Sequence, residues 1–436
     1  MAATADIVHL LRRTEFVARP ARVAELSARS IPDAVDDVLD IARNGQVVVP
    51  GELGTYRPDH NWEQYETAVF WWLGRMVTAA RPVQERMTLF WHGHFTSSWW
   101  DGLSRADYMT QQNQLYRELA LGSYRDLAQR MAIEPAMLVY LDNNGNRVGS
   151  PNQNFARELL ELFLLGVGNY TEGDVDAAAR AWTGHNAAWP DYVYQFVPER
   201  HDSGQKTFMG TTRDWDGPEI IDHVLLHHPT ARVAAARFIA RKLWVFFASP
   251  SPPPGVVEHL ADVFLASGLE VRSLLRAMLV HPEFYSPSSR QGVVRSPVEY
   301  LVALAVHTGL PVADSGFSWL GEQMGQSLFN PPNVSGWRPN AAWLHSAALS
   351  ARASMARHVT WGLRRNDGFA HLNDLSVTDA VTAAAQFFGI DDLSARSRAA
   401  LEAAHRAERQ AQTWKSWWAP TNLLTMTMLA PEFHLA

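Results

Sequence analysis

The chain of 436 residues contains no cysteine. Disulfide bonds and thiolate chemistry are therefore excluded, and a zinc ion would have to be held by histidine and carboxylate side chains. Charged residues are also scarce, because they make up 19% of the chain where about a quarter is usual. A helical chain with so little charge must bury much of its surface against other helices.

Long runs of one residue class are missing as well. No basic block exceeds a few residues and the formal net charge is −7, which argues against nucleic acid as a partner. The most apolar stretch, near residues 159–167, is well short of the roughly 20 residues that a membrane-spanning helix needs. The first residues show no basic region followed by an apolar one, so no signal peptide is visible. The sequence as given predicts a cytoplasmic protein with no membrane span, unless it is exported with a partner.

Several common catalytic motifs are also missing. The chain has no glycine-rich phosphate loop, no Gly-x-Ser-x-Gly elbow and no His-Glu-x-x-His zinc motif. Nucleotide-driven chemistry and the common serine-hydrolase route are therefore not expected.

Apolar residues recur at spacings of three and four along most of the chain, which predicts helices. Residues 192–197 alternate in polarity and form the one clear strand signal, with residues 206–209 as the expected partner strand. We therefore expect an all-α fold, a large multi-helix bundle-like single unit with a small β-like insertion around residues 190–210.

The chain is predicted to form one helical domain over residues 1–436. The alternative is a division at the proline-rich connector 249–255, which a helix cannot cross. A site-bearing half, residues 1–248, would then be followed by a C-terminal helical half, residues 255–436.

Seventeen tryptophans are an unusual number for this length. Such large side chains most often pack in cores, so a big helical core is one interpretation. The other interpretation is a stacking platform for sugars or other ring-shaped ligands. Both remain open at the level of the sequence.

A set of motifs, in order along the chain, resembles the bacterial family known as domain of unknown function 1800. These motifs lie at residues 9–14, 90–96, 141–143, 151–163, 166–175, 181–184, 201–202, 206–208, 228–231, 241–247, 296–299 and 332–337. Glu15 and Gln153 depart from the family pattern, in which Gly and Glu are usual. The resemblance implies a helical protein often encoded beside a twin-arginine-exported, sulfatase-like protein, and it implies no established activity.

The predicted helix at residues 154–165 carries the most informative polar residues. Glu158 and Glu161 lie one turn apart on a helix that is otherwise largely apolar. Buried carboxylates need a partner or a shifted pKa, and two of them at this spacing can bind a common metal ion. The alternative is an ion pair between Arg157 and Glu161, with Glu158 stabilised near the helix N-terminus.

His92 and His94 are the predicted counterparts of these carboxylates. Residues two apart on a helix point to nearly opposite sides, but Gly93 and the following polar residues indicate a helix end at which the two rings could converge. Imidazole is the commonest metal ligand near neutral pH. Alternatively, one histidine caps the helix and the other packs among aromatic residues.

Further polar residues are candidates for catalysis or substrate binding. His201 and Asp202, in the strand-like insertion, are predicted to act in catalysis, although a surface pair of little energetic value is the alternative. Asn154, Asp174 and Trp337 are predicted to contact the substrate. Glu219, His223 and His227 share one helical face at a ligand-like spacing and rank second as a metal site, because the polar residues around them indicate an exposed face.

Three functional hypotheses follow. The first is a metal-dependent enzyme, hydrolytic or oxidative, in which His92, His94, Glu158 and Glu161 hold Zn, Mn or Fe. The second is a metal-independent acid–base enzyme acting on a glycan, with Trp91, Trp99, Trp100 or Trp337 as the sugar platform. The third is a non-catalytic partner or chaperone of a sulfatase-like protein, for which low charge and many tryptophans would suit a large apolar interface. A small molecule or glycan is the expected ligand.

Overall fold

The structure is a computed structural model that describes residues 2–188, 191–313, 316–364, 369–411 and 418–436. Helices make up most of these residues, and the strands among them form two small two-stranded sheets. The predicted all-α class with a small β insertion is therefore confirmed.

The first two thirds of the chain form a long series of helices. They are α1 (Thr4–Thr14), α2 (Pro20–Ser27), α3 (Ile31–Val38), α4 (Asn61–Thr78), α5 (Val83–His94), α6 (Ala106–Glu118), α7 (Tyr124–Ala132), α8 (Pro135–Tyr140), α9 (Gln153–Glu158), α10 (Glu172–Ala181), α11 (Gly217–Asp222), α12 (Ala231–Phe247), α13 (Val256–Ala266) and α14 (Val271–Val280). The two segments Leu159–Leu165 and His223–His227 continue α9 and α11 as π-helices. Between α12 and α13 the proline-rich connector interrupts the helices, as predicted.

The β insertion consists of two separate hairpins. Strand β1 (His185–Ala188) pairs with β2 (Val193–Phe196), and β3 (Lys206–Phe208) pairs with β4 (Thr211–Arg213), both antiparallel. The predicted pairing of residues 192–197 with residues 206–209 is therefore wrong. Each strand pairs with its sequence neighbour instead, because short antiparallel strands are joined most easily through a tight connection.

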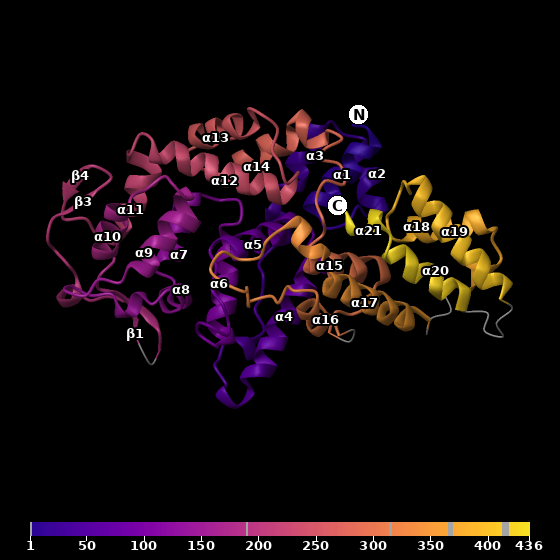
Figure 1. Cartoon of the computed structure of the whole chain (residues 1–436), viewed down its shortest axis with the longest axis horizontal. Coiled ribbons are helices and arrows are strands. Elements are labelled where there is room, and N and C mark those ends of the chain that lie inside the picture. Colours follow the sequence, from indigo (N-terminus) through magenta and orange to yellow (C-terminus); the bar gives the residue numbers. More distant parts are fainter. Residues whose placement is uncertain (1, 189–190, 314–315, 365–368, 412–417) are drawn as a thin grey trace.

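The last third of the chain is again helical. Its helices are α15 (Pro297–Thr308), α16 (Phe317–Gln323), α17 (Ser346–Arg364), α18 (Val377–Phe387), α19 (Ala395–Gln410), α20 (Trp418–Met428) and α21 (Pro431–His434). Figure 1 shows an elongated molecule with the hairpins and α7–α11 at one end and α18–α20 at the other. The central part contains α4, α5, α6 and α15, and the two termini lie near each other beside it.

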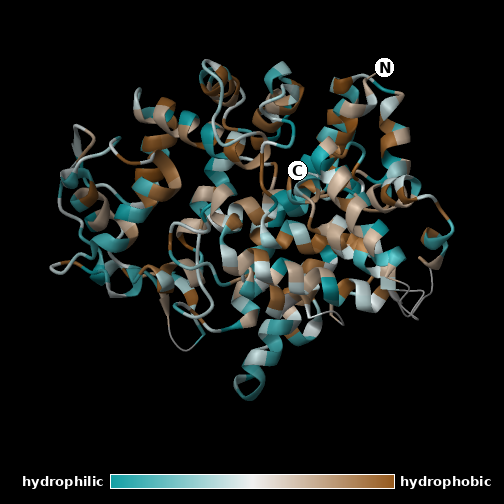
Figure 2. Cartoon of the chain, turned by 45° about the vertical axis from the view of Figure 1, so that its right-hand side comes forward, coloured by the Kyte–Doolittle hydropathy of each residue, from teal (hydrophilic) through white to brown (hydrophobic). Residues whose placement is uncertain are grey.

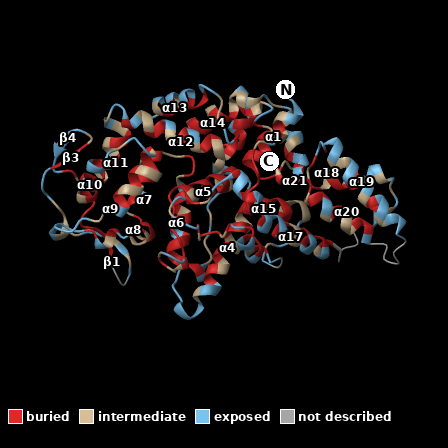
Figure 3. Ribbon diagram, in the orientation of Figure 1, coloured by how far each residue is buried: buried red, intermediate tan, exposed pale blue. Residues whose placement is uncertain are grey.

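Apolar and polar residues alternate along the same helices in Figure 2, as amphipathic helices packed on a core require. The buried side chains form two clusters, and Figure 3 shows burial concentrated where helices face each other. One cluster runs from α1 to α14, while the other joins α4 to the helices after residue 297. The two cores therefore do not separate at the connector 249–255, since α13 and α14 belong to the first core and α4 to the second.

Reciprocal caps hold the starts of helices α10 and α15. Thr171 and Asp174 form the predicted capping box of α10, and Ser296 and Glu299 form one at α15. None of the described helices is both long and apolar enough to cross a membrane.

Candidate functional site

A cavity of about 400 Å³ lies between α5, α12, the start of α15 and the loop at residues 335–343. This volume is in the range of pockets that enclose small ligands. Helix α5 contributes its residues at positions 89, 90, 93 and 94, and α12 contributes those at 241, 242, 245 and 246. Both sets follow helical spacing, so one face of each helix lines the cavity. His94 and Trp337, two residues predicted from the sequence as site residues, lie in its wall.

Lys242 and His94 form the polar centre of this cavity. Nζ of Lys242 lies 2.7 Å from Nδ1 of His94 and 5.2 Å from the centroid of the Phe238 ring. Nε2 of His94 lies 3.0 Å from the carbonyl oxygen of Phe163. A carbonyl oxygen can only accept, so Nε2 carries the proton and Nδ1 accepts from the lysine.

The Phe163 carbonyl that receives His94 belongs to the last turn of the π-helix Leu159–Leu165. Carbonyls in the last turn of a helix have no donor within the helix. The hydroxyl of Tyr124 donates to the same oxygen. The end of this helix therefore fixes the orientation of the His94 ring.

The electrostatics of the pair are unusual. Burial lowers the pKa of Lys242 to about 8. Burial and the charge of Lys242 together hold the pKa of His94 well below its ordinary value of 6.5, so the imidazole is neutral. In the described part of the chain, Lys242 has no carboxylate partner. A lysine in such surroundings can change its protonation near neutral pH.

The acidic residue that lines this cavity already has partners. Glu299 lines the cavity, but one of its carboxylate oxygens accepts from the Ser296 N–H at 2.6 Å and the other pairs with buried Arg86. Arg241 and Arg338 also line the cavity and are exposed, and their side chains form no hydrogen bond or ion pair with another described residue. The cavity is therefore basic, with cations that a ligand can reach.

Trp337 is brought to the cavity by a close approach of two backbones. Gly336 has φ +73°, and a Cβ atom there would lie 2.4 Å from the carbonyl oxygen of Gly93 on α5. Only glycine fits this position without movement of the backbone. The Trp337 ring then stands edge-on to His92, with 5.3 Å between the ring centroids.

His92 lies on the core side of this contact and not in the cavity. It is buried, and its Nε2 accepts from the backbone N–H of Phe329 at 3.1 Å. The rings of Trp72 and Phe329 surround it, and burial lowers its pKa to about 3. His92 thus helps to hold the loop that precedes Trp337. One of the two histidines packs among aromatic residues, as in the alternative interpretation of the sequence.

Among the described residues, Glu158 and Glu161 do not form a metal-ligand group with the two histidines. Glu161 accepts a hydrogen bond from the hydroxyl of Tyr170, and Arg157 pairs at 2.7 Å with Glu172 and not with Glu161. The alternative interpretation, an ion pair between Arg157 and Glu161, is therefore not what the structure shows. An i,i+4 pair requires α-helical spacing, whereas a π-helix begins at Leu159 and its hydrogen bonds span five residues. Burial, and then the charge of Glu161, raises the pKa of Glu158.

Among the described residues, no group of three or more histidine, aspartate or glutamate side chains lies close enough to hold a metal ion. Both ring nitrogens of His94 already have partners, and His92 binds a backbone N–H. The second-ranked set is also separated, since Glu219 caps α11 at Asp216 while His223 lies beside Trp215.

The remaining predicted residues have clear local partners. The Asn154 side chain donates to the Leu141 carbonyl oxygen at 3.2 Å, and the Asp174 carboxylate caps α10 and accepts from the Met209 N–H at 2.7 Å. His201 contacts the Thr183 carbonyl oxygen at 2.8 Å, while Asp202 pairs with Arg180 at 2.7 Å. These side chains hold loops in place, and His201 and Asp202 do not bond to each other.

His185, which lies near His201, was not predicted from the sequence as a site residue. His185 is buried, with Nε2 2.9 Å from an Asp216 oxygen and Nδ1 3.0 Å from the Tyr194 hydroxyl. Nothing in local sequence spacing connects these residues, because a hairpin and a helix start bring them together.

Lys242 was missed although the sequence held a signal for it. Only three of the 38 basic residues are lysines, namely Lys206, Lys242 and Lys415. Lys242 lies in the mostly apolar helix α12, where burial of an ammonium group costs free energy unless the group is paired.

Some tryptophans pack in the core, and others are exposed where a ring-shaped ligand could stack on them. Trp91 and Trp99 are buried, so they cannot be the sugar platforms predicted for them. Trp100 is exposed, and Trp337 is partly exposed in the cavity wall.

The chain matches a family model over residues 9–435, and that model is described as a protein of unknown function (DUF1800). No curated protein and no solved structure shows significant similarity to the chain. The match extends over nearly the whole length, from α1 to the end of α21, and therefore includes every element that lines the cavity. The chain belongs to the DUF1800 family.

Proposed function

We propose that this protein is an enzyme that acts on a small organic anion bound in the cavity between α5 and α12, with Lys242 as its acid–base group. One observation carries the proposal. Lys242 lies in a ligand-sized cavity, donates to a neutral histidine and has no carboxylate partner among the described residues. An ammonium of this kind is stabilised when a ligand brings the missing negative charge.

The geometry gives Lys242 free donors for such a ligand. An ammonium has three N–H groups, and one of them is directed to Nδ1 of His94. The other two are free to bind the acid group of a substrate, with Arg241 and Arg338 at the rim as further cations. The side chains of Phe90, Val245 and Trp337 offer apolar contact to the rest of the molecule.

The pKa of Lys242 suits proton transfer. A general acid or base works best when its pKa lies near the operating pH, and here that pKa is about 8. As an ammonium, Lys242 gives a proton to the substrate and becomes an amine; the reverse transfer restores it. His94 stays neutral throughout and is a positioning residue, because it holds Nζ without changing its own charge.

The metal-dependent hypothesis with Zn, Mn or Fe at His92, His94, Glu158 and Glu161 is less well supported by this geometry, since those residues do not converge. The acid–base alternative is retained, with Lys242 in place of the carboxylates and an anion in place of a neutral glycan.

Binding of a panel of small carboxylates, phosphates and sulfates, measured by calorimetry, tests the proposal. We expect at least one anion class to bind the wild-type protein and to lose about 2–5 kcal/mol of affinity in Lys242→Met, which removes a partly buried charge. Arg237→Met is the matched control, because it removes an exposed cation of α12 that does not line the cavity. Turnover of the bound class is then followed by NMR of the anion during incubation with the protein.

Two outcomes would count against the proposal. Anion binding that survives in Lys242→Met would place the ligand elsewhere. A full panel without any binding to the wild-type protein would remove the anion site, whatever other chemistry the cavity performs.

A further inference from the structure

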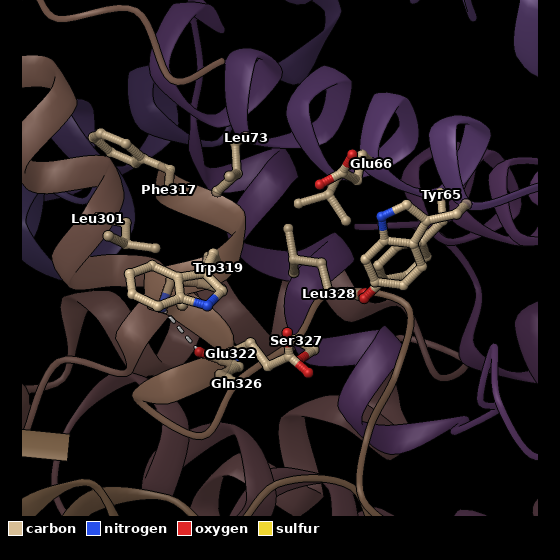
Figure 4. A pocket seen from close by; sticks show the side chains of 14 residues that line it. Tyr65, Glu66, Leu73, Leu301, Phe317, Trp319, Glu322, Gln326, Ser327 and Leu328 are labelled. Carbon is tan, nitrogen blue, oxygen red and sulfur yellow. Dashed lines mark hydrogen bonds between the residues drawn. The ribbon is translucent and has the colours of Figure 1, made fainter. Parts of the chain in front are cut away.

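A second cavity, of about 80 Å³, lies between α4, the start of α15 and α16. Its walls are mainly aromatic and aliphatic side chains. Figure 4 shows Trp319 and Glu322 from α16 on one side of the cavity and Tyr65 and Glu66 from α4 on the other. This cavity is not part of the proposed lysine site, although Gln326 lines both.

The aromatic residues here are exposed in a way that core packing does not explain. Trp319 is 61% exposed and Trp62, which also lines the cavity, is 48% exposed. Trp62 in turn stacks on the exposed ring of Trp100, with 5.7 Å between centroids and 27° between planes. Stacking of this kind holds the Trp62 ring in place at the surface, so its orientation is already set before any ligand binds.

The charge of the cavity is negative. Neither Glu66 nor Glu322 forms an ion pair or hydrogen bond through its carboxylate with another described residue. No lysine, arginine or histidine occurs among the described residues that line the cavity. Burial, followed by the charges of Glu322 and Glu66, raises the pKa of Tyr65, which places both carboxylates near that ring.

We propose that this cavity binds the head group of an organic ammonium compound, with the indole rings of Trp62 and Trp319 against its alkyl groups and Glu66 and Glu322 supplying the opposite charge. Indole faces attract cations through their quadrupole, and tryptophan does so best. A cation that carries alkyl groups also gains from the aromatic walls, unlike a strongly hydrated metal ion. The small volume suits a head group, because cavities that enclose a whole drug-sized ligand are about 300 Å³ or larger.

Calorimetric titration of the full chain with choline chloride, against a matched sodium chloride reference, tests this site. We expect saturable binding, and binding about tenfold weaker for 3,3-dimethyl-1-butanol, the neutral molecule of the same shape. Trp319→Ala and Glu322→Gln should each weaken choline binding about tenfold. Both residues are exposed, so the folded state is expected to tolerate either change.

Trp361→Ala serves as the matched control, because Trp361 is 57% exposed on α17 and does not line the cavity. Its choline affinity should equal that of the wild type. Equal affinity for choline and the neutral alcohol would overturn the proposal, as would binding that persists in Trp319→Ala and Glu322→Gln. Binding of cellobiose with none of choline would overturn it as well, and would assign the exposed indoles to sugars.

Discussion

The two cavities on either side of the first turn of α15 share one residue, Gln326, and differ in almost everything else. The cavity between α5 and α12 is large, and the cations Arg241, Lys242 and Arg338 line it without a carboxylate partner among the described residues. The cavity between α4 and α16 is small, and Glu66 and Glu322 line it without a cationic partner among the described residues. The start of α15 therefore separates two regions of opposite charge. Glu299, the acidic residue in the first turn of α15, does not offset the cations, because its carboxylate already binds the Ser296 N–H and Arg86.

The difference extends to how each cavity is built. The basic cavity depends on a fixed backbone contact between Gly93 and Gly336 and on a buried hydrogen-bonded chain from Lys242 through His94 to Phe163. The acidic cavity depends on exposed side chains. Changes to the backbone should therefore affect the first cavity strongly and the second one little.

Gly336→Ala should have the largest effect. Its Cβ would lie 2.4 Å from the Gly93 carbonyl oxygen, and we expect a loss of about 3–4 kcal/mol in the free energy of unfolding from strain and displaced packing. Gly268→Ala is the matched control, because Gly268 also has φ +73° but nothing lies within 4 Å of an added Cβ. The control should lose only about 1 kcal/mol. Chemical denaturation of both variants measures the difference, and equal losses would mean that the Gly93 contact is not tight.

Lys242→Met should stabilise the protein at neutral pH. Because the pKa of Lys242 is lowered to about 8 from 10.5, the folded state binds fewer protons than the unfolded state between these values. The penalty is complete below pH 8 and disappears as the pH rises past 10.5, so stability of the wild type increases across this window. We expect Lys242→Met to gain about 1–3 kcal/mol at pH 7 and less as the pH approaches 10. Denaturation at several pH values checks this, and a variant less stable than the wild type at pH 7 would contradict it.

Glu161→Gln should have the smallest effect on stability, below about 1 kcal/mol, because the Tyr170 hydroxyl can donate to an amide oxygen as well. This variant also tests whether a third region, outside the two cavities, holds a metal ion. A metal held at Glu158 and Glu161 would make a third region the reactive centre, and the variant would then lose metal. Elemental analysis of wild type and variant, after supplementation with Zn, Mn and Fe, decides between these outcomes. We expect the metal content of the two proteins to be the same.

Much of the fold could be predicted because it depends on local patterns. Helical periodicity, the Thr171–Asp174 capping box and the proline-rich break at 249–255 are each encoded within a few neighbouring residues. The pairing of the strands could not be predicted in the same way, because the alternation in residues 192–197 indicates a strand but does not indicate which strand it pairs with.

The site was predicted only in part for a different reason. The sequence singled out His94 and Trp337, which line the cavity, but it gave no link between His94 and Lys242, because these two residues come together only through long-range packing. The contacts of Glu158 and Glu161 could not be predicted, because the change from α- to π-helical hydrogen bonding at Leu159 leaves no mark in the residue pattern. His185, Tyr194 and Asp216 likewise converge from separate elements.

The most direct test of the central claim is the pKa of Lys242 itself. With only three lysines in the chain, limiting acetylation at a series of pH values followed by peptide mass spectrometry reports Lys242 separately, with added Nα-acetyl-lysine as the internal reference. We predict a midpoint near pH 8 for Lys242 and protection of this residue by the anion class that the protein binds. A midpoint at or above that of the reference amine, unchanged by every anion, would contradict the account.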